Sequence, residues 1–187
     1  MRTNRAVLVF PLLVGAQWAC GASTTYEGGS VSGTVAGSTF VVASALGFDQ
    51  CPAEDAGSTC LPTGAGIFLT NRADFNTCTS DVLDFANLDL LNLGVGGQNA
   101  PLTAGTYDVG AGGATAAFST MTSTCTGRPN VNATSGSVTL TRVGSARIAG
   151  TYDVTFGVQG RFLGAFDVSI CPQPPPTQNP IMPPVCR

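Results

Sequence analysis

The sequence predicts an all-β domain, either an antiparallel β-sandwich or a partly open β-barrel, behind an N-terminal signal segment. Apolar and polar residues alternate regularly through the segment 136–171, as they do in strands with one buried face. The chain has 24 glycines among its 187 residues, and only 10% of its residues are charged. This composition favours short strands joined by many turns over helices.

The segment 136–171 is typical of three consecutive antiparallel strands. One face of the middle strand carries apolar side chains or glycine, at Ile148, Gly150, Tyr152, Val154 and Phe156. The corresponding face of the last strand has the same character, at Phe162, Gly164, Phe166, Val168 and Ile170. We expect both faces to lie in the core, where burial stabilises the fold by about 25 cal/mol for each Å² of apolar area.

The connection between these two strands is expected to be a five-residue turn over residues 157–161. This turn sets Phe156 opposite Phe162 and Tyr152 opposite Phe166 on the buried face. It also sets a glycine opposite a bulky residue twice, in the pairs Gly164 with Val154 and Gly150 with Val168.

The preceding hairpin has to keep Val138 opposite Tyr152 and Leu140 opposite Gly150 if the apolar faces are to coincide. A two-residue loop over 144–145 would turn Val138 and Leu140 outward, because a slip of one residue reverses the face of every side chain. We therefore expect an odd-length turn with a bulge.

The rest of the domain is expected to contain shorter strands. Val31–Gly37 and Thr39–Leu46 are predicted to form the first hairpin, around a tight turn at residues 37–38. Phe48–Gly66 is predicted to be a loop closed by a disulfide, and Val82–Leu93 is assigned to a strand although part of its pattern fits a helix. Further strands are expected at Ile67–Thr70, around Tyr107 and at Ala114–Met121, with a loop from Thr122 to Thr134.

Four regions are predicted along the chain: a signal peptide over residues 1–19, a flexible tether over 20–30, the β domain over 31–171 and a proline-rich tail over 172–187. Arg2 and Arg5 form the basic start of the signal peptide, and the apolar stretch that follows is too short to span a bilayer. The tail is expected to adopt an extended polyproline II conformation.

Cys20 is the candidate lipid-anchor residue. The sequence Ala19-Cys20-Gly21 resembles the end of a bacterial lipobox, in which the cysteine is acylated and becomes the mature N-terminus. The match is partial, because Gln17 and Trp18 stand where the pattern prefers leucine and a small residue. Lipid anchoring predicts a cell-envelope location at the outer membrane, with the membrane as a partner. The alternatives are cleavage after Gly21, which gives a secreted or periplasmic protein, and an uncleaved anchor.

Six cysteines remain besides Cys20, and an even number in an exported chain predicts three disulfides. They are Cys51, Cys60, Cys78, Cys125, Cys171 and Cys186. Loop-closure entropy favours Cys51–Cys60 and Cys171–Cys186, which leaves Cys78–Cys125. The alternative pairing joins Cys78 to Cys171 and Cys125 to Cys186. A zinc site is not expected, because the chain has no histidine and no Cys-x2-Cys pair.

Several motifs carry a family resemblance. The domain closes with Gly-Ser-Val-Thr-Leu-Thr, Gly-Thr-Tyr-Asp-Val-Thr-Phe and Gly-Ala-Phe-Asp-Val-Ser-Ile-Cys. A glycine-led hairpin, Ile-Phe-Leu-Thr-Asn and Ala-Gly-Thr-Tyr-Asp-Val precede them. Over Val31 to Cys171 these motifs resemble exported β-rich lipoproteins of myxobacterial type. The resemblance implies the architecture and export, and it implies no site residues, because it carries no known activity.

The composition excludes several kinds of site. Without histidine there is no Ser-His-Asp or Cys-His nucleophile, and without lysine there is no Schiff base. Once Arg2 and Arg5 leave with the signal peptide, six arginines stand against eleven acids, a net charge of −5. Such a surface is not expected to bind nucleic acid or anionic lipid by charge.

Carboxylates are the remaining acid and base groups. They cluster at Asp81, Asp84 and Asp89, and again at Asp49, Glu54 and Asp55. Either cluster could form a glycosidase-like pair or a calcium site, but neither has the diagnostic spacing. We therefore expect solvated surface acids, with no metal, no cofactor and no catalytic residue.

These observations predict a non-enzymatic cell-envelope module with a structural or binding role, whose partner could be a protein, a glycan or a small hydrophobic ligand. A cavity lined by Phe40, Phe68, Tyr107 and Tyr152 would favour a small-ligand carrier, and a filled core would favour a structural role. The alternative is a carboxylate-dependent, glycoside-type hydrolase, which a cleft with two acids about 5–10 Å apart would support.

Overall fold

The computed structural model describes residues 28–50, 63–73, 86–96, 100–110, 113–127 and 129–171, with the backbone alone at positions 49 and 50. The predicted signal peptide, most of the predicted tether and the predicted proline-rich tail lie outside these residues. Within these ranges, no helix has the length and apolar character needed to cross a membrane.

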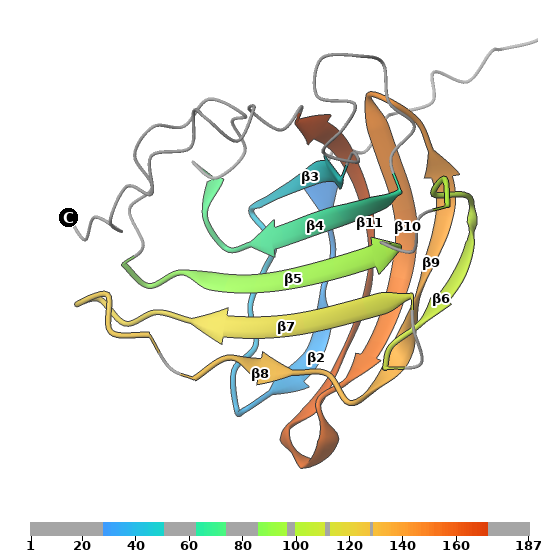
Figure 1. Cartoon of the computed structure of the whole chain (residues 1–187). Coiled ribbons are helices and arrows are strands. Elements are labelled where there is room, and N and C mark those ends of the chain that lie inside the picture. The colour runs from blue at the N-terminus through green and yellow to red at the C-terminus, as the bar shows by residue number, and fades with distance from the viewer. Residues whose placement is uncertain are drawn as a thin grey trace, which may run out of the picture.

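The described residues form the all-β fold that the sequence predicts, as one sheet curled into a half-barrel (Figure 1). Its strands are β1 (Gly28–Gly29), β2 (Ser32–Val35), β3 (Ser44–Gln50), β4 (Gly64–Thr70), β5 (Asp89–Gly96), β6 (Gly105–Asp108), β7 (Ala114–Thr120), β8 (Val131–Asn132), β9 (Ser135–Val143), β10 (Arg147–Thr155) and β11 (Gly160–Cys171). A 3₁₀ turn, η3 (Gly157–Gln159), joins β10 to β11.

Neighbouring strands follow the order β6-β9-β10-β11-β3-β4-β5-β7-β8. Most neighbours are antiparallel, whereas β3 pairs with β11 in parallel at only two positions, Ile170↔Gly47 and Cys171↔Phe48. β1 and β2 pair with β11 elsewhere along its length. Figure 1 shows the sheet as two walls, with β9, β10 and β11 in one and β3, β4, β5 and β7 in the other.

The two ends of the curled sheet meet where the chain passes from one wall to the other. Val131–Asn132 pairs with β7, while Ser135–Val143 pairs with β10 and β6. The bridge Val109↔Ala114 links the segment after β6 to the start of β7. We call this meeting of β6, β7 and β8 the seam. The bridge pairs backbone groups there that an open sheet edge would leave unpaired.

Phenylalanine rings fill the space between the walls near the start of β11. The ring centroid of Phe162 lies 5.0 Å from that of Phe118, 5.7 Å from Phe40 and 5.8 Å from Phe156. All three contacts are edge-to-face, a geometry that aromatic pairs prefer. The core continues through fully buried aliphatic residues: Ile67, Leu69, Leu91, Leu93, Val138, Leu140, Ile148, Val154 and Val168.

The inward faces of β10 and β11 are those predicted, but their register differs from the prediction by two residues. Tyr152 lies opposite Gly164, and Val154 lies opposite Phe162. The predicted five-residue turn over 157–161 is wrong, because the connection is the three-residue turn η3. A shift of two residues keeps every side chain on its face, so the alternation alone does not distinguish the two registers.

The hairpin of β9 and β10 contains the predicted bulge. Both predicted pairs are confirmed, Val138↔Tyr152 and Leu140↔Gly150. Thr141 is the extra residue, and its hydroxyl donates to the carbonyl oxygen of Ala149 at 3.2 Å. The predicted odd-length turn is wrong, because two residues connect Gly144 to Arg147, whose backbone groups are hydrogen-bonded at 3.0 Å. The extra residue in the bulge, rather than an odd-length turn, keeps the apolar faces of β9 and β10 on the same side of the sheet.

The predicted N-terminal hairpin is wrong. β2 pairs with β11 and β3 pairs with β4, so the two segments are not partners. A tight turn is present one residue earlier than predicted, at Ala36 and Gly37, whose φ values of 51° and 76° match a type I′ turn. The chain then crosses to the other wall, where Phe40 packs among the phenylalanine rings. Gly28 and Gly29, predicted as tether, form β1.

Several strand boundaries also differ from the prediction. β3 and β4 extend into the predicted loop Phe48–Gly66, β5 begins at Asp89 rather than at residue 82, and β8 lies in the predicted loop Thr122–Thr134. The glycine pairs Gly64↔Gly96 and Gly66↔Gly94 lie where β4 begins earlier, and where β5 ends later, than the predicted strands. Such glycines carry no alternation signal and resemble turn residues in the sequence.

Candidate functional site

A groove with a volume of about 570 Å³ lies at the seam. It is lined by β5, β7, the segment after β6 and the end of β8. The lining residues are Asn92, Gly94, Val95, Gly96, Val109, Gly110, Gly113, Ala114, Thr115, Ala116, Ala117, Asn132 and Ala133. The volume falls within the range of about 300–1,000 Å³ that is usual for ligand pockets.

Two asparagine side chains stand on either side of a small residue in this groove. Asn92, Ala117 and Asn132 form one cross-strand row over β5, β7 and β8. Both asparagines are exposed, and Ala117 between them is half-buried. Two strand spacings put the backbones of the asparagines about 10 Å apart. Each amide offers donors and an acceptor, so the row can hydrogen-bond a ligand from two sides.

Glycine keeps the neighbouring part of the groove free of side chains. Gly94 lies opposite Thr115, and a Cβ atom at Gly94 would stand only 2.5 Å from the Thr115 hydroxyl oxygen. Glycine at this position therefore lets the threonine hydroxyl lie over β5. Glycine within a strand is common where a ligand or another backbone approaches closely.

A tyrosine fixes the segment that leads into β6. The hydroxyl of Tyr107 donates to the carbonyl oxygen of Thr103 at 2.7 Å and accepts from the amide of the same residue at 3.2 Å. A tyrosine bonded to backbone a few residues upstream is known from Greek-key sandwiches as a tyrosine corner. Val109 comes directly after β6, and its amide donates to the carbonyl oxygen of Gly136 at 2.9 Å. This bond and the bridge Val109↔Ala114 hold the segment after β6 against β9 and β7.

The side chains that line the groove are uncharged. None of its lining residues has an ionisable side chain, and its polar groups are two amides, one hydroxyl and backbone amides and carbonyls. These groups bind neutral polar molecules by hydrogen bonds. General acid or base catalysis needs a titratable side chain within hydrogen-bond reach of the substrate, which the lining does not supply.

The carboxylate clusters predicted from the sequence fall mostly outside the described residues. The structure does not describe Asp81, Asp84, Glu54 and Asp55, or the side chain of Asp49. The side chain of Asp89 accepts from the Asn71 amide at 3.2 Å, and the backbone amide of Asp89 donates to Asn71 at 2.9 Å. Within the described ranges, no three acidic or cysteine side chains are grouped to hold a metal ion.

The four aromatic residues proposed to line a cavity are not brought together. Phe40 packs among core rings, and Tyr152 is buried beside Gly164. Phe68 belongs to the opposite face of its wall, where its ring lies 5.3 Å from that of Phe48. Tyr107 supports the seam. Aromatic side chains pack together in the interior near Phe40, and the groove lies at the seam instead.

Two of the predicted disulfide cysteines are described, and both are disulfide-bonded. They are Cys125, after β7, and Cys171, at the end of β11. Three strands, β3, β4 and β5, separate β11 from β7, so these two cysteines are not partners of each other. Cys51, Cys60, Cys78 and Cys186 lie outside the described residues, as does Cys20. The predicted pairings stay predictions.

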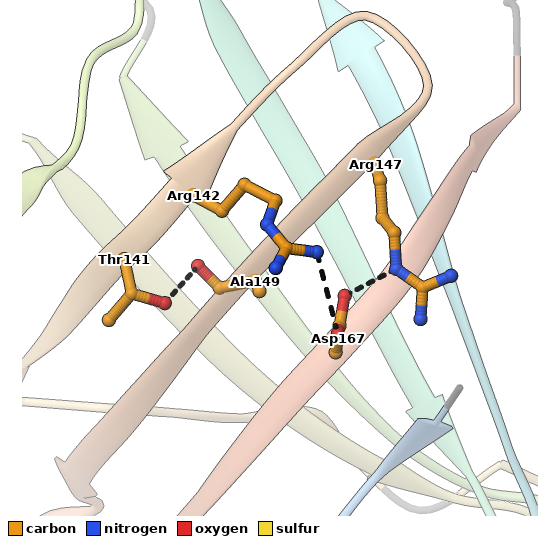
Figure 2. Close-up of polar contacts among 5 residues, drawn as sticks. All are labelled: Thr141, Arg142, Arg147, Ala149 and Asp167. Carbon is orange, nitrogen blue, oxygen red and sulfur yellow. Dashed lines mark hydrogen bonds and ion pairs between the residues drawn. The ribbon is translucent and has the colours of Figure 1, made fainter. Parts of the chain in front are cut away.

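The outer face of the β9–β11 wall carries two groups of ion pairs. Arg161 binds Asp153 through both its Nε, at 2.6 Å, and its Nη2. The hydrogen bond from Arg161 holds the pKa of Asp153 below its usual value. Figure 2 shows the second group, in which Arg142 and Arg147 both point toward Asp167.

No family model, curated protein or solved structure matches this chain. The groove was missed by reasoning from the sequence because its residues come from separate strands and form no motif. The available signal was the pattern of Gly-Val-Gly at 94–96 followed by small residues at 113–117. Glycine at alternate positions of a strand leaves a face without side chains.

Proposed function

We propose that this chain is an exported module of the cell envelope, anchored at the outer membrane through a lipid on Cys20, which binds an uncharged polar ligand in the groove at the seam. The anchor and the location derive from the lipobox resemblance around Cys20. The membrane is then one partner of the protein, and the ligand of the groove is the other.

The observation that carries the binding role is the row of Asn92, Ala117 and Asn132. Two exposed amides face a common space above one small residue, inside a groove of about 570 Å³. Pockets with a few well-placed polar groups and no charge suit neutral ligands with several hydroxyl or amide groups. A saccharide or a short uncharged peptide segment has this character.

Native mass spectrometry of the protein purified from its own envelope tests the proposal. The mature chain should begin at Cys20 and carry the added mass of acyl groups, and part of the protein should carry a bound neutral molecule. A mature chain without acyl mass would contradict the anchor. A chain that carries no molecule in any preparation would contradict the binding role.

A pair of tryptophan variants tests whether the groove is the binding site. Ala117→Trp places a large ring between the two amides, and it should abolish the bound mass while the thermal midpoint changes little. Thr151→Trp is the matched control, because Thr151 is an exposed residue on β10 in the other wall. Retention of the bound mass in Ala117→Trp would place the site elsewhere.

A further inference from the structure

One cross-strand row joins the start of the described chain to an arginine. Arg142 pairs with Ala149, Ala149 pairs with Asp167, and Asp167 pairs with Gly28. The row therefore crosses β9, β10, β11 and β1 in sequence. Three strand spacings place the backbone of Arg142 about 15 Å from that of Gly28.

Arg142 is the exposed cation of this row. Arg147 donates to Asp167 at 2.6 Å, whereas Arg142 lies 3.8 Å from the same carboxylate. The Arg142 side chain is 57% exposed, against 20% for Arg147. Figure 2 shows both arginines reaching toward the single carboxylate. Because two arginines share the one carboxylate of Asp167, the group of three side chains keeps a net charge of +1.

The bulge at Thr141 explains why Arg142 can reach this carboxylate. The extra residue moves Arg142 into the row of Ala149, and the small Ala149 side chain leaves space above β10 for the arginine. Without the bulge, the alternation would direct position 142 to the other face of the sheet.

The polypeptide enters the domain at the same end of the wall. β1 and β2 run antiparallel to β11, from Asp167 toward Gly160, so the chain before Gly28 arrives from the end that carries the turn between β9 and β10. Seven residues separate Cys20 from Gly28. Even fully extended they span at most about 29 Å, so acyl chains on Cys20 keep Gly28 within about that distance of the membrane.

We propose that the face around Arg142 rests on anionic phospholipid headgroups and orients the anchored domain on the membrane. The inference rests on the lipid anchor of the proposed function. The net charge of −5 opposes recruitment by charge, so the acyl chains supply attachment and Arg142 selects the side that faces the lipid. One arginine near an anionic surface favours such an orientation about fivefold.

The test uses the full lipidated chain in vesicles, after mass spectrometry has confirmed the acyl group on Cys20. A fluorescent amino acid replaces either Ser145, in the turn beside Arg142, or Val158, in η3 at the other end; both positions are exposed. The vesicles contain phosphatidylcholine, alone or with an equal share of phosphatidylglycerol, and a nitroxide-headgroup lipid as quencher. Quenching should be several-fold stronger at position 145 than at 158 when phosphatidylglycerol is present, and high salt should weaken the difference.

Two arginine variants complete the design. Arg142→Gln should remove the difference between the two positions. Arg161→Gln is the matched control, because its side chain is also 57% exposed on the same face but lies six residues before Asp167, near the start of β11, and is bound to Asp153. It should leave the difference unchanged.

The two proposals fail in different ways. Equal quenching at both positions, or an unchanged difference in Arg142→Gln, would overturn the orientation by Arg142 while leaving the anchor intact. Absence of acyl mass on Cys20 would overturn the anchor, and with it the premise of the orientation. A difference that persists in pure phosphatidylcholine would show that anionic headgroups are not the partner.

Discussion

The hydroxyl of Tyr152 donates to the carbonyl oxygen of Ser30 at 2.7 Å, across 122 residues of sequence. The bond passes over Gly164, the cross-strand partner of Tyr152. Ser30 is held twice more, because its backbone amide donates to the carbonyl oxygen of Ala165 at 2.8 Å and its hydroxyl accepts from the amide of Ala165 at 3.1 Å. The first described segment of the chain is thus tied to the last strand of the core.

Tyr152→Phe should destabilise the fold by about 1–3 kcal/mol, because the variant keeps the ring but leaves the Ser30 carbonyl without this donor. Equilibrium unfolding in urea measures the change. Tyr107→Phe is the control, since that hydroxyl bonds only to Thr103, four residues away at the surface, and its loss should cost less. Equal losses in both variants would contradict a special role for the long-range bond.

Burial raises the pKa of Tyr152 above the usual tyrosine value. Its folded pKa lies above its unfolded pKa, so its contribution to stability is fully present below about pH 10 and is lost as the pH rises further. Stability should therefore fall above about pH 10, and Tyr152→Phe should fall less steeply over the same range. Unfolding free energies at about pH 8 and about pH 11 check this, and parallel curves would count against it.

Two glycines in the strands should differ in how well they tolerate replacement by alanine. A Cβ atom at Gly164 would overlap the Ser30 carbonyl and lie 2.7 Å from the Tyr152 hydroxyl, so Gly164→Ala should cost at least about 2 kcal/mol. A Cβ atom at Gly66 meets no atom within 4 Å, so Gly66→Ala should be neutral or stabilise by about 0.5–1 kcal/mol. Thermal melts of both variants measure the contrast. A tolerated alanine at position 164 would refute the close approach of Ser30.

The ion pair of Asp153 and Arg161 should make stability depend on pH only in the acid range. Because the folded pKa of Asp153 is lowered, its contribution is present above about pH 4 and is lost as the pH falls through the folded value. Both side chains are about half exposed, so the effect is small. Asp153→Asn should flatten the acid limb of the stability curve slightly. Asp108→Asn, on exposed β6, is the control. The stability of this variant should fall more steeply with decreasing pH than that of Asp153→Asn.

The disulfide prediction is checked by peptide mapping without reduction. The expected bonds are Cys51–Cys60, Cys78–Cys125 and Cys171–Cys186, because short loops cost less entropy to close. A peptide that joins Cys78 to Cys171 would support the alternative pairing. A free thiol at Cys125 or Cys171 would disagree with the bonded state of both residues.

The sequence predicted which side chains are buried more reliably than which strands are neighbours. Period-2 alternation identified the inward faces of β10 and β11, because burial is a property of single residues. Pairing depends on loop geometry and on distant segments, and the pattern identified β9, β10 and β11 as neighbours but failed for one turn and for β2. The turn η3 is two residues shorter than predicted, and β2 pairs with β11, about 130 residues away, rather than with β3.

The row of asparagines in the groove could not have been predicted from local pattern. Asn92, Ala117 and Asn132 become neighbours only through two strand pairings, and each is an ordinary surface residue in the sequence. Composition did predict the absence of histidine and lysine chemistry, because that follows from counting residues. No pattern in the sequence indicated the long-range hydrogen bond from Tyr152 to Ser30, since neither residue is unusual for a strand.

The pairing of β1 and β2 with β11 has a consequence for the order in which the chain can fold. These first strands have their backbone partners between Gly160 and Asp167, at the far end of the domain. A chain that crosses a membrane from its N-terminus cannot complete that part of the sheet until nearly all of it has emerged. Contacts so distant in sequence also slow folding. For a chain exported as proposed, β1 and β2 would therefore stay without their partner strand during translocation, until β11 arrives.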